Sequence, residues 1–126
     1  MHKSRLAGFI LDCQSNDLDG AARFWSATLG MRELGLGEDS GVYKRLDASA
    51  RDLVIEVQTV AHPSRVHLDI ETDNIEAEVA RLEMLGTKRV EAVKSWQVME
   101  APTGQRFCVV RAKKSLNGAP GVTTWR

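Results

Sequence analysis

The sequence has few of the residues that cross-link or stiffen small proteins. Its 126 residues include two cysteines, three prolines and one tyrosine, and aromatic residues make up only 6% of the chain. Cys13 and Cys108 lie in apolar runs without CxxC spacing, so we expect two reduced thiols packed as small hydrophobic side chains. This pattern argues against a disulfide scaffold and against a zinc knuckle.

An excess of charge of either sign is also missing. Seventeen basic residues balance seventeen acidic ones, and no segment gathers the lysines and arginines of a nucleic-acid partner site. The apolar stretch after Met1–Arg5 ends at Asp12, which is too short for a signal sequence or a membrane span. We therefore expect a cytoplasmic protein with neither nucleic acid nor membrane as a partner.

What is present is typical of a globular domain. Apolar residues make up 43% of the chain and charged residues 27%, and a chain of this length buries about two-thirds of its unfolded surface. We expect one domain over residues 1–112. Residues 113–126 are rich in turn-forming residues and are predicted to be an irregular tail, although Trp125 suggests that its end docks on the domain.

An internal repeat organises the chain. Ile10–Cys13 resembles His67–Ile70, and each segment precedes an amphipathic helix and a glycine. The predicted first helix has Asn16 as its N-cap and stops at Gly30. Its apolar stripe comprises Leu18, Ala21, Ala22, Trp25 and Leu29, and we expect Trp25 and the adjacent Phe24 in the core.

The second helix has the same design. Asp73 and Glu76 are spaced like a capping box, and Gly86 marks the end of the helix. Its apolar stripe comprises Ile75, Val79, Leu82 and Leu85.

Three short strand-like runs follow each helix. They span residues 31–36, 42–46 and 53–57 in the first half, and 89–93, 96–99 and 107–111 in the second. The predicted fold class is therefore α+β, with two βαβββ modules at about residues 5–59 and 65–111.

Alternation along the strands predicts two different faces. One face carries apolar residues that we expect to pack under the helices, namely Val66, Leu68 and Ile70 on one strand and Leu53, Ile55 and Val57 on another. The opposite face carries the candidate functional residues Ile10, Asp12, Glu56, His67, Asp69 and Cys108.

Three motifs resemble the vicinal oxygen chelate superfamily, which includes glyoxalases, bleomycin-resistance proteins and extradiol dioxygenases. They are Phe24-Trp25 before Leu29-Gly30, residues 66–69 leading into 73–77, and residues 101–108. The resemblance implies paired βαβββ modules that form a curved eight-stranded mixed sheet around a cleft. It also implies a homodimer, for which Trp125 offers an aromatic anchor.

The superfamily's metalloenzymes hold a divalent ion through His or Glu side chains on the first and last strands of each module. The resemblance places these positions at Ile10 (Gly8 in a shifted alignment), Glu56, His67 and Cys108. Because catalytic sites use three or four protein ligands, we expect no tightly bound metal. The alternative is a divalent ion (Zn, Ni, Mn, Mg or Fe) at Glu56 and His67.

Several side chains have two interpretations. His67 is a metal ligand or general base whose ring Asp69 orients, or a histidine that only forms hydrogen bonds. Glu56 is a second ligand or base, or a solvated carboxylate. Asp12 and Asp69 form an acid/base pair only if they are close, and Tyr43, Trp96 and Met99 are candidates for the wall of a ligand cavity.

Three functions follow, in order of preference. The first is binding of a small, partly apolar molecule by Glu56, His67, Asp69, Tyr43, Trp96 and Cys108 without a metal. The second is a metal-dependent lyase, isomerase or dioxygenase that uses Glu56 and His67. The third is metal-free acid/base catalysis by these two residues.

Overall fold

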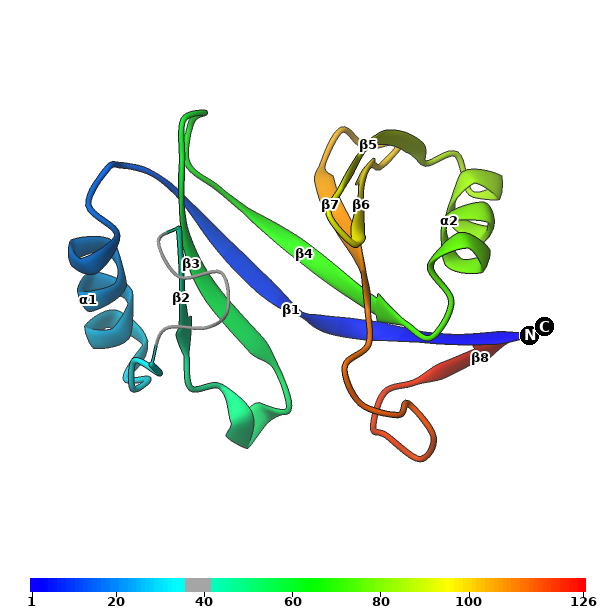
Figure 1. Ribbon diagram of the computed structural model, residues 1–126, viewed down its shortest axis with the longest axis horizontal. Helices are drawn as coiled ribbons and strands as arrows, with labels where there is room; N and C mark the ends of the chain where they lie inside the picture. Colours follow the sequence, from blue (N-terminus) through cyan, green and yellow to red (C-terminus); the bar gives the residue numbers. More distant parts are fainter. Residues whose placement is uncertain (36–41) are drawn as a thin grey trace. The chain divides into compact units, whose positions relative to one another are not determined.

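In the described part of the chain, two α-helices and eight strands of a mixed sheet make up the fold (Figure 1). The computed structural model of the chain describes residues 1–35 and 42–126. The elements are β1 His2–Gln14, α1 Leu18–Leu29, β2 Tyr43–Leu46, η1 Ser49–Arg51, β3 Val54–Val60, β4 Arg65–Thr72, α2 Ile75–Met84, β5 Lys88–Val93, β6 Trp96–Glu100, β7 Arg106–Arg111 and β8 Thr123–Trp125. The predicted α+β class and eight-stranded mixed sheet are confirmed.

The chain divides into two compact units. One unit is Gly8–His67, and the other combines Met1–Ala7 with Leu68–Arg126. The long strands β1 and β4 each begin in one unit and end in the other. The sequence predicts that the chain divides once, in the linker before residue 65. In the structure the start of β1 belongs instead to the same unit as Leu68–Arg126.

The unit Gly8–His67 contains strands in the order β2-β3-β1, with α1 packed on β2 and β3. β1 and β3 are parallel and pair Ile10 with Glu56. The N-cap of α1 is Asp17 rather than Asn16, because the Asp17 side chain accepts a hydrogen bond from the Gly20 amide. Gly30 ends the helix in the left-handed conformation, as predicted.

The strand predicted at residues 31–36 is wrong for the part that the structure describes. Glu33 forms only an isolated bridge with Leu46, so the described first module has one strand fewer than predicted. Leu36 lies outside the described residues.

Gly8 marks a close approach between two strands of this unit. It pairs with Val54 across the parallel ladder of β1 and β3. A Cβ atom built at position 8 would overlap the backbone carbonyl oxygen of Val54. The local ladder therefore requires a residue without a side chain here.

The other unit contains strands in the order β4-β7-β6-β5, covered by α2. Its core consists of Val79, Leu82, Met99 and Val109, with Ile75 and Phe107 packed against them. Met99 is fully buried there, in the hydrophobic core. Asn74 caps α2 by accepting from the Ala77 amide, so the predicted capping box is wrong.

The predicted burial of Val66 and Leu68 under the helices is wrong. Val66 is 58% exposed and Leu68 is 42% exposed. The helices pack mainly on the outer strands, α1 on β2 and β3 and α2 on β5, β6 and β7, and so leave this face of β4 open. Val57 on β3 is fully buried, as expected for a strand beneath α1, whereas Phe24 on α1 is 59% exposed and lies outside the core.

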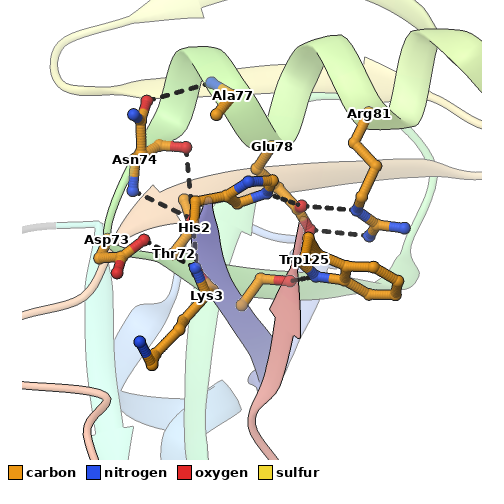
Figure 2. Close-up of polar contacts among 10 residues, drawn as sticks. His2, Lys3, Thr72, Asp73, Asn74, Ala77, Glu78, Arg81 and Trp125 are labelled. Atoms are coloured by element: carbon orange, nitrogen blue, oxygen red, sulfur yellow. Dashed lines mark hydrogen bonds and ion pairs between the residues drawn. The ribbon is translucent and has the colours of Figure 1, made fainter.

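The tail predicted to be irregular ends in a strand. β8 pairs antiparallel with the beginning of β1, and Trp125 donates its indole N–H to Ser4 Oγ at 2.8 Å (Figure 2). The Arg81 guanidinium lies 3.7 Å from the centre of the Trp125 ring. Trp125 therefore docks its own tail on β1 and α2.

A buried carboxylate joins these elements. Glu78 on α2 has no solvent exposure and accepts hydrogen bonds from His2 Nε2 at 2.8 Å and from two Arg81 nitrogens at 2.8 and 2.9 Å (Figure 2). Burial acts to raise the pKa of Glu78, but hydrogen bonds from Arg81, His2 and Ser4 outweigh it and lower the pKa from 4.5 to about 2. The carboxylate is therefore charged and fully partnered.

Acid should remove the stabilisation that this charge provides. Because the pKa of Glu78 is lower in the folded protein than its usual 4.5, the contribution is complete above about pH 4.5 and disappears as the pH falls through about 2. Glu78→Gln has no charge to titrate, so the difference in unfolding free energy between wild type and Glu78→Gln should shrink from neutral pH to about pH 2. Urea melts across this range measure the difference, and a constant difference would contradict the prediction.

Candidate functional site

A histidine and a buried aspartate form the centre of the candidate site. His67 on β4 and Asp12 on β1 both belong to the unit Gly8–His67, and His67 Nδ1 lies 2.7 Å from Asp12 Oδ2 in a hydrogen bond. The Asp12 side chain is 2% exposed and that of His67 is 14% exposed. Arg65 on β4 places its Nε 3.6 Å from the same aspartate oxygen.

The other carboxylate oxygen of Asp12 is an exception to the rule that buried polar atoms form hydrogen bonds. Asp12 Oδ1 is buried and has no hydrogen-bond partner among the described residues. A buried carboxylate oxygen without a partner costs free energy, and such exceptions in native proteins accompany strain, catalysis or an unseen partner.

Further polar groups lie on neighbouring strands of the same unit. Gln58 pairs with Asp12 on β1 and with Tyr43 on β2, and its side-chain amide donates to the Tyr43 hydroxyl at 3.3 Å. Glu56 is one pleat away on β3, opposite Ile10 and Arg45. The unit thus carries Tyr43, Glu56 and His67, three of the six predicted ligand-binding residues.

The remaining three candidates belong to the second unit. Asp69 on β4 lies opposite Cys108 on β7 in a parallel pair, and both side chains are partly buried. Trp96 begins β6, with Lys94 Nζ 6.0 Å from the centre of its ring. Both cysteines are free, and burial is the main reason that the pKa of the Cys13 thiol is raised.

The metal positions implied by the resemblance fit this chain poorly. Ile10 is 3% exposed and has no donor atom, and position 8 has no room for a side chain. Of the other two positions, Glu56 belongs to the same unit as His67, whereas Cys108 belongs to the other unit.

Sequence reasoning missed the partner of His67. It assigned the orientation of the His67 ring to Asp69, two residues along the strand, whereas the carboxylate that is hydrogen-bonded to Nδ1 is that of Asp12 on another strand. One signal was available, because Asp12 and His67 were both placed on the polar face. Nothing in the sequence gave the strand register that brings them together.

The family model that describes the glyoxalase-like domain matches residues 8–110 of this sequence. The chain belongs to this family. No curated protein matches the sequence of this glyoxalase-like domain.

Solved structures with the same fold include enzymes. Methylmalonyl-CoA epimerase from Mycobacterium tuberculosis is 16% identical, with a TM-score of 0.63 over 91% of this chain and 92% of the epimerase chain. A superfamily member from Vibrio splendidus 12B01 is 14% identical, with a TM-score of 0.55 over 86% of this chain and 99% of that one. An extradiol ring-cleaving dioxygenase from B. fuscum is 16% identical, with a TM-score of 0.57 over 87% of this chain and 33% of the dioxygenase. At these identities the similarity establishes the fold of the glyoxalase/bleomycin resistance/dioxygenase superfamily.

None of the helices among the described residues is long and apolar enough to cross a membrane.

Proposed function

We propose that this glyoxalase-like domain binds a small, partly apolar molecule through His67. The observation that carries the proposal is the 2.7 Å hydrogen bond between His67 and the nearly buried Asp12. A ligand site needs a few polar groups in fixed orientations beside apolar surface. His67 is held in this way, and Tyr43 on β2 adds an aromatic ring with a hydroxyl group.

The position of His67 supports binding over a purely structural role. Its side chain is 14% exposed, so solvent reaches part of the ring while Asp12 anchors it from below the surface. Glu56 and Gln58 on the adjacent strand β3 supply further polar groups on the same unit.

A second candidate function is metal-dependent catalysis with His67 as a metal ligand. The specific observation in its favour is again Asp12, because metal-binding histidines commonly donate their second ring N–H to a carboxylate. A divalent ion held there would polarise oxygen atoms of a substrate. Epimerase and dioxygenase relatives make an isomerase or dioxygenase the natural form of this candidate.

Replacing His67 should weaken ligand binding. Phenol and benzoate serve as small, partly apolar probes, and ligand-observed NMR with calorimetry measures their dissociation constants. Because one hydrogen bond to a ligand is lost, we expect His67→Ala to weaken binding of the better probe by about tenfold. His62→Ala is the matched control, because His62 bonds only the neighbouring Pro63 carbonyl in the described residues and should leave binding unchanged.

Two outcomes would contradict this reading. Equal binding by wild type and His67→Ala would exclude His67 as the anchor of the ligand. Calorimetric titration with zinc, nickel, manganese and iron(II) tests the second candidate, because submicromolar affinity that is lost in His67→Ala and kept in His62→Ala would favour the metalloenzyme.

A further inference from the structure

Asp12 and His67 differ in their ability to donate a hydrogen bond. An ionised carboxylate accepts hydrogen bonds and cannot donate them, whereas a neutral imidazole carries one proton on either ring nitrogen. At 2.7 Å, the contact between Asp12 Oδ2 and His67 Nδ1 is a short hydrogen bond of the charge-assisted kind. The proton of the neutral ring therefore belongs on Nδ1.

The surroundings of Asp12 keep the carboxylate in place. Its side chain is 2% exposed on the long strand β1, and Arg65 Nε lies 3.6 Å from the oxygen that His67 contacts. Both basic groups, Arg65 and His67, come from β4, so one oxygen of Asp12 lies near two side chains of one strand.

We propose that Asp12 is a positioning residue that fixes the tautomer and the ring orientation of His67. This inference rests on the proposed function, because it matters only where His67 meets a ligand. With the proton held on Nδ1, any other partner of the ring meets it at Nε2, whose lone pair accepts a hydrogen bond or binds a cation.

A structural role alone explains the arrangement less well. A hydrogen bond that merely ties β1 to β4 would be formed at lower cost by a neutral side chain, since burial of a carboxylate with one unpartnered oxygen is unfavourable. A carboxylate selects the Nδ1–H tautomer because it accepts hydrogen bonds and cannot donate them. An asparagine at position 12 would present an N–H to Nδ1 and reverse the tautomer.

Nitrogen NMR on protein labelled with ¹⁵N-histidine tests the proposal directly. The chain has three histidines, so His67→Gln identifies the signals of His67. At mildly alkaline pH, where imidazoles are mostly neutral, we expect the wild-type His67 proton on Nδ1 and a shift to Nε2 in Asp12→Asn. Arg65→Gln is the matched control, because it removes the other neighbour of the same oxygen and should leave the proton on Nδ1.

The wild-type spectrum is decisive even if Asp12→Asn does not fold. A proton found on Nε2, or on both nitrogens, in the wild-type protein would overturn the proposal. A folded Asp12→Asn variant with an unchanged tautomer would overturn it as well.

Ligand binding separates this inference from the proposed function. In Asp12→Asn we expect binding of the better probe, phenol or benzoate, to weaken by about tenfold, as for a misaligned hydrogen bond. If wild type binds neither probe while the tautomer is as expected, the proposed function fails and the positioning by Asp12 stands. If wild type binds a probe but carries its proton on Nε2, the positioning fails and the binding function stands.

Discussion

Replacing Glu78 by alanine is expected to lower the free energy of unfolding by about 3 to 5 kcal/mol, the range for breaking a buried ion pair from one side. The Glu78 carboxylate has no solvent exposure and accepts hydrogen bonds from His2 and Arg81. Its removal leaves the 8% exposed His2 side chain and a guanidinium without their acceptor, and opens a gap between α2 and the start of β1. Urea denaturation at neutral pH, followed by circular dichroism, measures the loss.

Glu76→Ala provides the control on the same helix. Glu76 is 77% exposed and lies 3.4 Å from Arg89 in a surface ion pair, so its loss should change stability by about 0.5 kcal/mol or less. If Glu78→Ala and Glu76→Ala lowered the free energy of unfolding equally, the hydrogen bonds of Glu78 with His2 and Arg81 would not stabilise the fold.

Met99→Ala should destabilise the protein by about 2 to 5 kcal/mol, because it leaves a cavity in a filled core. Met99 on β6 is fully buried and packs with Val79 and Leu82 of α2. Thermal and urea melts of the variant measure the effect.

Leu68→Ala is the informative comparison for Met99→Ala. The sequence places Leu68 beneath a helix, where truncation would cost as much as at Met99, but in the structure it is 42% exposed. We expect a cost of about 1 kcal/mol or less for the chain on its own. A loss at dilute protein concentration as large as that of Met99→Ala would contradict the exposed placement. The homodimer stays a prediction, and Val66 and Leu68 are apolar surface that it could cover.

Local signals predicted the helices and most strands. The apolar stripes and glycine stops placed α1 and α2 within a residue or two of their observed ends, and the predicted runs 42–46, 89–93 and 107–111 correspond to β2, β5 and β7. The predictions failed for residues whose burial depends on tertiary packing. Nothing local distinguishes the face of β4 that a helix covers from the face that none covers, and so Val66 and Leu68 were placed inside.

The same limit applies to the sites. Alternation placed His67 and Asp12 on one face, but register between distant strands determines that they pair. Glu78 was the harder case, since a glutamate within a helical stretch is usually solvated. Its partner His2 precedes it by 76 residues, a separation over which sequence patterns carry no contact information.

The close packing of β1 against β3 limits how this domain could acquire the ligand set of the metalloenzymes. No point mutation at position 8 can supply a histidine or glutamate, because even the first side-chain atom would collide with the Val54 carbonyl, part of the main chain that cannot be mutated away. The accessible path runs through Ile10, whose neighbour in the register is Glu56. A designer who wishes to install a metal therefore has to exchange a core isoleucine for a polar ligand and accept the loss of packing that this entails.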